Sequence, residues 1–424
     1  MEVDVVLTKK GSDGHCLVVA EGYQGYHVHR FGRVAPGGPG KGKNFAKEYP
    51  LHRISRGKTG NGIDSFKAPS LKDSKEHWEN LSVFLENVDR MALRLKPLLQ
   101  KVQRDNSVVV MVANAGVIEL LANFVCAANS RKLDISTVIV FATDKETFDV
   151  ALGLGLSAFF DEEGGFGITP KEEARGYGDK TFTNLMYKKV LSVYLPMYLG
   201  YNVLFQDVDI IWNADPLPYF HGEVVKKEES EGDHDEDLYD AYFMDDGARS
   251  LRYAPYSANS GFYFLRNNDR TMYMMTTLMY IGDSIIHTHS HQQTLSTLLT
   301  EFNSLYGMSV KTLSQDEFPG GKAYHHNKPY MKKWMEGEFE PIIFHMCWTL
   351  NKDDKLSYLQ QLGGWYLNAQ CTGDSMRANS GDPSKALGCC SAEPVITCHF
   401  KDKPSIVKCD DSPDRDKGGG KFLK

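Results

Sequence analysis

Two aspartates separated by one residue follow the most informative apolar stretch of this chain. The stretch is VLFQDVDIIW at residues 203–212, and it contains Asp207 and Asp209. We expect its first half to be a parallel strand whose carboxyl end carries both carboxylates, at the edge where open α/β sheets bind ligands. One carboxylate can reach a divalent cation and the other a ribose hydroxyl or a metal-bound water, which suits a nucleoside diphosphate. The alternative is that Asp207 caps the strand end and Asp209 faces solvent.

Apolar strands alternating with amphipathic helices are predicted around this stretch. The helix His77–Gln103 and the strands Ser107–Ala113 and Ser136–Ala142 precede it, and the helix Phe182–Leu199 leads directly into it. Such alternation implies right-handed crossovers and an α/β fold, with a mainly parallel sheet and helices on both faces. The later predicted elements are Ala241–Met244, Gly261–Leu265, Arg270–Tyr280, Gln292–Phe302 and Pro341–His345.

The composition excludes two classes of protein. The 424 residues are 42% hydrophobic and 24% charged, which is typical of a globular chain with one large core or two smaller ones, so a disordered chain is excluded. A formal charge of −7 leaves no positive excess to neutralise a phosphate backbone, so we expect no nucleic-acid partner. The acidic run at 226–240 lacks the glycine and alternate-ligand pattern of an EF-hand, which favours a solvated insertion loop over a calcium site.

No signal peptide or membrane-spanning segment is predicted. The most apolar stretch, residues 108–128, approaches the length of a spanning helix, but Asn114, Glu119 and Asn123 interrupt it. We interpret it as a buried strand, a turn and a helix. The first residues carry early acids and no long apolar run.

Five of the eight cysteines crowd the C-terminal tail, which has little periodic hydrophobicity. Disulfides formed in an oxidising compartment are the usual way to stabilise such a segment. Zinc or free thiols are the alternatives, although the tail has no clean CxxC pair and only one histidine, His399. Along the whole chain we expect an irregular N-terminal extension at 1–76 with a short strand at Cys16–Ala20, an α/β domain at 77–366 and a cysteine-containing tail at 367–424.

Five segments occur in an order that resembles a known enzyme family. They are VVVMVANAGVIELLANFVCAANSRKL (108–133), FATDKETFD (141–149), LMYKKVLSVYLPMYLGYNVLFQDVDIIWNADPLPYF (185–220), NSGFYFLR (259–266) and IIFHMCWT (342–349). Over roughly residues 107–366 they resemble the nucleotide-diphospho-sugar transferases that include plant rhamnogalacturonan xylosyltransferases and extensin arabinosyltransferases, with algal and protist relatives nearest. The resemblance implies a Rossmann-like GT-A fold, a nucleotide-sugar donor, a manganese-type cation and a Golgi lumenal setting.

The resemblance also implies a metal site. Asp207 and Asp209 match the metal-binding DxD of such transferases, and Asp207 is expected to contact the donor as well. His345 resembles the distal histidine that completes the site, and imidazole with carboxylates suits Mn²⁺ or Mg²⁺. The alternative for His345 is a core histidine that is hydrogen-bonded to the backbone. In the relatives a glycine and a lysine follow this histidine to hold the diphosphate. Here Lys352 and Lys355 follow without that glycine, so both lysines remain candidates for the phosphate contact.

Further donor contacts are expected at the ends of two core strands. Ala113 and Asn114 end the first strand and Asp144 ends the second, where the nucleoside of a GT-A donor lies. Helix capping is the alternative for Asn114 and for Asp144. Lys189 resembles a basic position that faces the donor, and we include it among the catalytic candidates. We expect its neighbour Lys188 to be solvated.

The NSGF segment and a glutamine pair are expected to face the sugar. Small residues there let a strand approach the sugar closely, although a tight turn would explain the glycine equally well. Gln292 and Gln293, the other catalytic candidates, stand where many relatives carry Asp-Gln, and glutamine can bind hydroxyls but cannot act as a base or nucleophile. Trp348 is a candidate for an aromatic platform that binds the acceptor, and core packing is the alternative for it. The substrate candidates are Asn259, Ser260, Gly261 and Trp348.

These residues, together with the resemblance, predict a metal-dependent glycosyltransferase that moves a sugar from a UDP-sugar to a glycan or hydroxylated protein acceptor. The resemblance implies that the anomeric configuration is retained. A front-face mechanism is favoured, because the sequence nominates no nucleophilic carboxylate. One alternative is a non-catalytic nucleotide-sugar or glycan-binding protein on the same fold. Another is an aspartate-nucleophile phosphatase, but such enzymes carry Thr or Val at the position that Ile211 occupies here. The family is usually tethered by an N-terminal anchor. We therefore expect this chain to lack its true N-terminus or to reach the Golgi lumen or secretory pathway differently, with membrane contact only through an anchor not visible here.

Overall fold

The N-terminal part contains regular structure that its composition did not predict. The computed structural model describes residues 69–167, 169–170, 172, 174, 178–222, 239–249, 253, 255–378 and 386–395, and the backbone of four earlier strands. These strands form an antiparallel sheet in the order β1-β2-β3-β4. The short strand expected at Cys16–Ala20 lies within β2, whereas the other three strands were not expected. They are short segments joined by Gly- and Lys-rich connections that mask their alternation. Their bounds are β1 (Glu2–Thr8), β2 (His15–Glu21), β3 (Val28–Val34) and β4 (Leu51–Ile54).

The helix α2 (Leu71–Val102) begins six residues before the predicted start at His77. A capping box sets this start: Ser70 Oγ accepts from Asp73 N at 3.1 Å, and Asp73 Oδ2 accepts from Ser70 N at 3.2 Å. The apolar period located the helix, but reciprocal capping decides where it begins.

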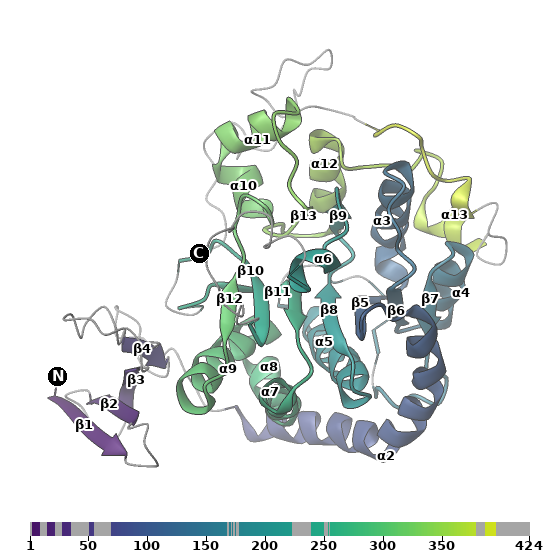
Figure 1. The fold of residues 1–424 in the computed structure, drawn as a ribbon. Helices are drawn as coiled ribbons and strands as arrows, with labels where there is room; N and C mark the ends of the chain where they lie inside the picture. The colour runs from purple at the N-terminus through teal and green to yellow at the C-terminus, as the bar shows by residue number, and fades with distance from the viewer. Residues whose placement is uncertain are drawn as a thin grey trace.

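A seven-stranded sheet forms the centre of the molecule in the order β12-β10-β11-β8-β5-β6-β7 (Figure 1). β11 runs antiparallel to its neighbours β10 and β8, and the other adjacent pairs are parallel. The predicted mainly parallel α/β sheet is therefore confirmed. The strands are β5 (Ser107–Ala113), β6 (Val138–Ala142), β7 (Ser157–Phe159), β8 (Asn202–Gln206), β10 (Ala241–Asp245), β11 (Ala258–Leu265) and β12 (Val310–Thr312).

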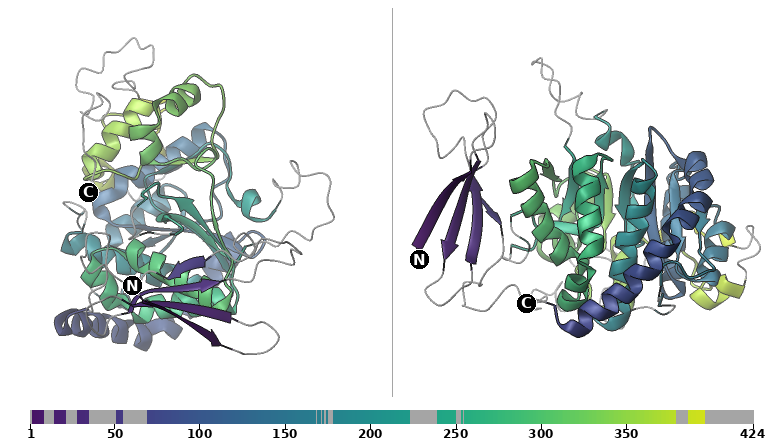
Figure 2. Two further views of the ribbon diagram at one scale, coloured as in Figure 1. Left: turned by 90° about the vertical axis from the view of Figure 1, so that its left-hand side faces the viewer. Right: turned by 90° about the horizontal axis from the view of Figure 1, so that it is seen from below.

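Helices cover both faces of this sheet (Figure 2). Alternate side chains of β5 enter two separate cores, with Val109 and Met111 in one and Val108 and Val110 in the other. The first core includes residues of α3 (Ile118–Ser130), α4 (Lys145–Gly153), α6 (Leu217–Phe220), α10 (Gly321–His326), α11 (Lys328–Met335) and α12 (Lys352–Leu362). The second includes residues of α2, α5 (Lys180–Tyr198), α7 (Asp269–Tyr280), α8 (Gly282–Thr288) and α9 (His291–Tyr306).

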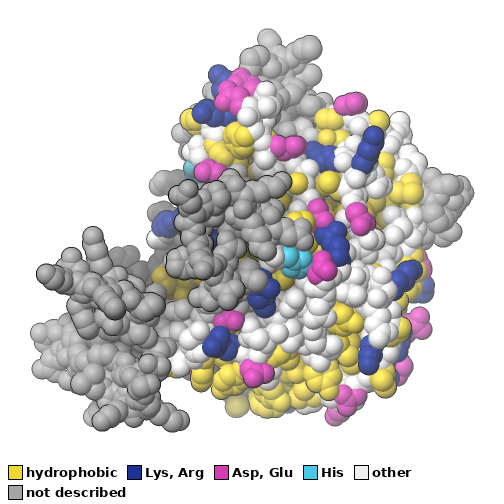
Figure 3. All heavy atoms as spheres, viewed as in Figure 1, with side chains coloured by type: hydrophobic (Ala, Val, Ile, Leu, Met, Phe, Trp, Pro, Cys, Tyr) yellow, Lys and Arg dark blue, Asp and Glu magenta, His cyan; other side chains and the backbone are white. Residues whose placement is uncertain are grey.

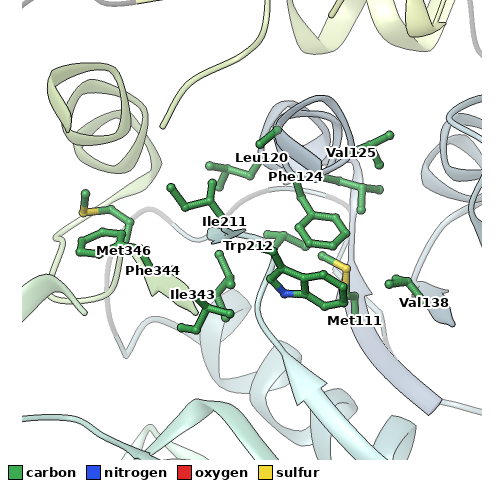
Figure 4. Packing of buried hydrophobic residues seen from close by; sticks show 14 of the residues in the cluster. Met111, Leu120, Phe124, Val125, Val138, Ile211, Trp212, Ile343, Phe344 and Met346 are labelled. Atoms are coloured by element: carbon green, nitrogen blue, oxygen red, sulfur yellow. The ribbon is translucent and has the colours of Figure 1, made fainter. Parts of the chain in front are cut away.

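A separate two-stranded sheet lies beside the central one. β9 (Ile210–Trp212) pairs antiparallel with β13 (Ile343–His345), so the last predicted core strand pairs outside the main sheet. The Trp212 ring meets the Phe124 ring of α3 edge-on at 5.3 Å between centroids (Figure 4). Its Nε1 donates to Gln206 Oε1 at 2.7 Å, which fixes β9 relative to β8.

The predicted disulfides are confirmed for two pairs: Cys371–Cys389 encloses the short helix α13 (Gly373–Ala378) in sequence, and Cys126–Cys390 joins the tail to α3. Cys398, Cys409 and all but the last two residues of the acidic run at 226–240 lie outside the described residues. In the part that the structure describes, no helix combines the length and apolarity needed to cross a membrane. Acidic and basic side chains are interspersed on the face drawn in Figure 3.

Candidate metal and nucleotide-sugar site

Two sheets hold the aspartate pair in place. Asp207 follows β8, and its backbone N–H donates to Gly261 O of β11 at 2.8 Å. Asp209 precedes β9, and its carbonyl accepts from Met346 N, just beyond β13, at 3.0 Å. The two residues therefore bridge the central sheet and the small sheet. Asp209 is 2% exposed, so the alternative in which it faces solvent is wrong.

His345 completes a cluster with both aspartates. Its Nε2 lies 3.4 Å from Asp209 Oδ1 and 4.0 Å from Asp207 Oδ2. One ligand atom from each of the three residues can be chosen so that all lie within 4.8 Å of one another. The His345 Nδ1 atom is buried without a hydrogen-bond partner among the described residues. The ring is thus aimed at the carboxylates, which does not match a core histidine bonded to backbone.

Gly261 leaves room for this cluster. A Cβ atom at this position would lie 2.5 Å from His345 Cε1, 2.7 Å from Asp207 Oδ2 and 3.1 Å from Asn259 Oδ1. Any side chain would therefore displace one of the three groups. Two carboxylates and an imidazole around a small space form a donor set that suits Mn²⁺, and the residues present thus fit the expected cation.

Two lysines contact the aspartates. Lys189 Nζ lies 2.5 Å from Asp207 Oδ1, and Lys355 Nζ lies 2.5 Å from Asp209 Oδ2. Burial opposes ionisation of Asp209, but the charge of Lys355 and the contact with His345 hold the pKa of that carboxyl well below its usual range. Asp209 therefore remains ionised, and both aspartates lie beside a positive rim formed by Lys189 and Lys355.

The two candidate lysines have different partners. Lys352 Nζ lies 3.6 Å from Glu119 Oε2, near the start of α3, whereas Lys355 reaches the aspartate cluster. One helical turn along α12 separates the two positions. Of the two predicted phosphate contacts, Lys355 is the one that the structure brings to the metal candidates.

A left-handed backbone position follows His345 even though the expected glycine is absent. Trp348 adopts it with φ of 60°, and its Nε1 donates to Asp246 O at 2.9 Å. Its half-buried ring meets the His326 ring edge-on at 5.8 Å between centroids, so it is not a fully buried core residue. For a bulky residue this conformation costs free energy, on the order of 1–3 kcal/mol, and such positions concentrate at functional sites.

The NSGF residues lie inside β11 and do not form a turn. Asn259 Oδ1 accepts from Gly261 N at 2.8 Å, and the Ser260 N and Oγ atoms donate to Gln292 Oε1 at 3.1 and 3.2 Å. Gln292 is thereby tied to the strand that forms one wall of the metal cluster. Gln293 is half-buried at the next position of α9.

The sequence analysis missed Asp246, which follows β10. Its side chain is 8% exposed, and its Oδ1 accepts from Asn259 Nδ2 at 2.8 Å. Burial raises the pKa of this carboxyl, outweighing the hydrogen bonds from Asn259 and Gln292. An acidic pair directly after the predicted strand Ala241–Met244 was the available signal, since ligands bind beyond the carboxyl ends of such strands.

Comparison with known proteins identifies the domain that carries this cluster. The sequence profile of the nucleotide-diphospho-sugar transferases matches residues 134–359, which is more than half of the chain. The chain belongs to the nucleotide-diphospho-sugar transferase family. The matched transferase domain contains Asp207, Asp209, His345 and both lysines of the rim.

The curated relatives of this transferase domain share about a quarter of its residues. They include a UDP-galactose:fucoside alpha-3-galactosyltransferase of Dictyostelium discoideum (27% identical, covering 46% of this chain and 30% of the relative). The beta-arabinofuranosyltransferase RAY1 of Arabidopsis thaliana is 26% identical, and the match covers 63% of this chain and 49% of the relative. The UDP-D-xylose:L-fucose alpha-1,3-D-xylosyltransferase 3 of Arabidopsis thaliana is 25% identical, and the match covers 46% of this chain and 51% of the relative. The chain thus spans between about a third and a half of the length of these relatives. Among solved structures, it is similar to the galactosyltransferase LgtC at 11% identity and a TM-score of 0.36, covering 66% of this chain and 95% of that one.

In this transferase domain, the predicted nucleoside contact Asp144 serves as a helix cap. Its Oδ1 accepts from Thr147 N and Oγ1 at 2.8 Å, and its Oδ2 accepts from Ala115 N at 2.9 Å. The capping alternative is confirmed. Both carboxylate oxygens are engaged, so Asp144 shapes the turn after β5.

Asn114 does not cap a helix through its side chain. Its Nδ2 donates to the backbone carbonyls of Pro170 and Glu172 at 3.2 and 2.7 Å, and its buried Oδ1 has no partner among the described residues. Ala113, the last residue of β5, is buried, and its carbonyl accepts from Thr143 N at 3.0 Å. The position predicted to contact the nucleoside is therefore a hydrogen-bonded turn in which Asn114 Oδ1 is a buried acceptor without a partner among the described residues.

The expectation that Lys188 is solvated is wrong. Its side chain is 2% exposed, and its Nζ has no hydrogen-bond partner among the described residues. Burial lowers the pKa of this amine to about 7. It borders a cavity of about 30 Å³ whose walls include Phe141, Phe160 and Phe166. The helix α5 is buried around much of its circumference, so adjacent lysines need not alternate between core and solvent.

Proposed function

We propose that this protein is a metal-dependent glycosyltransferase that moves a sugar from a UDP-sugar to a glycan or hydroxylated protein acceptor, with retention of configuration. The observation that carries the proposal is the cluster of Asp207, Asp209 and His345, flanked by Lys189 and Lys355, within the matched family domain. The names of the relatives, which are galactosyl-, arabinosyl- and xylosyltransferases, support the same chemistry.

The three clustered side chains would hold Mn²⁺ or Mg²⁺. When bound, such a cation neutralises the diphosphate as it departs. The ammonium groups of Lys189 and Lys355 lie next to the cluster and stabilise the same developing charge, because they are already in place before the reaction. Lys355 is 28% exposed and Lys189 13% exposed, so both can meet a ligand without a large rearrangement.

The sugar is assigned to the wall formed by β11 and the end of β10. Gly261 leaves room beside this wall for the metal cluster. Asp246 and Asn259, which are hydrogen-bonded to each other, are assigned to the sugar hydroxyls. Gln292 holds Ser260 and acts on the sugar through that strand. Trp348, half-buried beside His326, is assigned to the acceptor.

The reaction exchanges one bond to the anomeric carbon for another. The bond from this carbon to the diphosphate oxygen breaks, the acceptor hydroxyl oxygen bonds to the same face, and the acceptor proton passes to the departing phosphate. Gln292 Oε1 already accepts two hydrogen bonds from Ser260, which supports the front-face route over attack by the glutamine. The protein mainly orients the two partners.

A lumen of the secretory pathway, such as the Golgi, is the proposed compartment. The pairs Cys126–Cys390 and Cys371–Cys389 support it, because disulfides persist in oxidising environments.

Calorimetry with UDP, in the presence and absence of MnCl₂, tests the proposal. We expect UDP binding that requires the metal, and the absence of such binding would refute it. Release of UDP from a panel of UDP-sugars with candidate acceptors then separates an enzyme from a sugar-nucleotide binder that does not turn over.

The variant Asp209→Ala should abolish metal-dependent UDP binding. Because Asp209 is buried against Lys355, its removal leaves an uncompensated charge and costs about 3–5 kcal/mol of stability. The double variant Asp209→Ala/Lys355→Met should recover much of that stability but not the binding. Metal-dependent binding by the stable double variant would exclude Asp209 as a ligand.

A further inference from the structure

The C-terminal segment 367–395, which the structure describes at 367–378 and 386–395, packs through these described residues against α3, the helix that follows the first core strand. The disulfide Cys126–Cys390 joins α3 to this segment, and Cys371–Cys389 closes the segment around α13. Figure 1 shows α13 beside α3 and α4. Its Met376 is buried in the same core as α3. Where it is described, the segment is therefore fixed to the domain at several points.

A second group of contacts lies at the amino-terminal end of α3. Glu119 Oε1 accepts from Gly373 N of α13 at 2.9 Å, and Glu119 Oε2 lies 3.6 Å from Lys352 Nζ of α12. Arg377 Nη1, also from α13, donates to Ala115 O at 3.1 Å. The segment thus contacts both the start of α3 and the short 3₁₀ turn Ala115–Val117 before it.

The peptide groups of Ala115 are held from two sides by charged side chains. Asp144 accepts from its N–H at 2.9 Å, and Arg377 donates to its carbonyl. Hydrogen bonds to ionised groups are roughly twice as strong as neutral ones. The turn directly follows Asn114, whose side chain holds the backbone at 170 and 172. Loss of either charged partner would therefore loosen the turn at the nucleoside end of the site.

We propose that Arg377 and Glu119 are positioning residues for the donor, and that the disulfide-bonded segment 367–395 acts as a buttress for the turn at Ala115–Val117. The inference rests on the proposed function and on the expectation from the sequence that the nucleoside lies beside Ala113 and Asn114. Arg377 contacts no member of the metal cluster among its described interactions, which are with Ala115, Glu146 and Asp374. The buttress therefore acts on nucleotide affinity and leaves the metal cluster unchanged.

The variant Arg377→Ala in the full, oxidised chain tests this. We expect the UDP Kd at saturating MnCl₂ to rise about tenfold, the value for one lost charge-assisted hydrogen bond. Hydrogen exchange at Ala115–Val117 should accelerate, while Mn²⁺ affinity stays constant. Arg377→Lys keeps a charged donor and should restore part of the affinity. Arg131→Ala is the matched control, because Arg131 also bonds a carbonyl of α3, that of Ala127 at 3.1 Å, and lies over the Tyr366 ring.

An unchanged UDP Kd in Arg377→Ala would overturn the inference while leaving the proposed function intact. Equal weakening by Arg131→Ala would also overturn it, since the segment would then contribute only general stability. If the unaltered chain does not bind UDP with metal, the proposed function fails and this inference with it. Weaker UDP binding confined to Arg377→Ala, with faster exchange in the turn, supports it.

Discussion

The substitution Gly261→Ala places one methyl group inside the proposed metal site. The new Cβ would lie 2.5 Å from His345 Cε1 and 2.7 Å from Asp207 Oδ2. Carbon atoms in contact prefer separations of about 3.5–4.0 Å, so the imidazole or the carboxylate must move by about 1 Å. Gly261 lies within β11, between two paired strands, so the backbone cannot easily absorb that movement.

This displacement is large compared with what a metal site tolerates. Ligand distances vary by only about 0.2 Å, so a shift of about 1 Å removes one of the three ligands. Changes outside the ligand set already cost about 10–100-fold in affinity, so we expect a loss of at least about 100-fold here. The free energy of unfolding should fall by about 1–3 kcal/mol, as for other overpacked sites.

Titration of Mn²⁺ in the presence of UDP, followed by calorimetry or by the electron paramagnetic resonance signal of free Mn²⁺, measures the effect without an acceptor. Gly364→Ala is the matched control, because its Cβ would lie 2.9 Å from Ile211 Cδ1 and from Leu362 Cδ1, both apolar. It should lower stability without weakening Mn²⁺ binding. A stably folded Gly261→Ala variant with unchanged Mn²⁺ affinity would refute the cluster as the metal site.

Three further predictions follow from buried groups. Lys188→Met should stabilise the protein by up to about 5 kcal/mol at and below pH 7, since burial lowers the pKa of this amine from 10.5 to about 7. In the unfolded chain this amine stays protonated up to its ordinary pKa, so the stability gained by the substitution should fall as pH rises from 7 toward 10.5. Chemical denaturation at several pH values measures this, and a stability gain independent of pH would contradict the lowered pKa of Lys188. Asp246→Asn should lower kcat/KM at least about tenfold with UDP affinity unchanged, because the new amide cannot accept hydrogen bonds from both Asn259 and Gln292 as the carboxylate does. The comparison is Asp245→Asn, because the half-buried Asp245 pairs with the exposed Arg249, and equal effects of the two variants would exclude a role of Asp246 at the sugar. Replacing Cys126 and Cys390 by Ser should cost about 2–5 kcal/mol of unfolding free energy, and an unchanged denaturation midpoint would show that the bond does not form.

Local patterns in the sequence were sufficient for the elements and for part of the site. Continuous apolar runs and period-3.6 apolar patterns depend on neighbours within one element, and they located β5, β6, β8 and α5 to within a few residues. The aspartate pair at the end of an apolar strand pointed to the ligand edge for the same local reason. Local patterns could not predict which of Lys352 and Lys355 reaches the aspartates, because this depends on how α12 is rotated against α3 and β9.

The sequence by itself determined an α/β domain of the nucleotide-diphospho-sugar transferase family with a DxD pair at a strand end. Only the tertiary structure decided which groups surround that pair, since His345 and Lys355 lie more than 130 residues further along the chain and arrive through the β9–β13 pairing and the packing of α12. The tertiary structure also places Asp246 beside Asn259, buries Lys188 and brings the Arg377 side chain to the Ala115 carbonyl. The physical reason is that periodicity reports which face of an element is buried, whereas the partner of a buried polar group depends on the long-range packing that brings distant elements together.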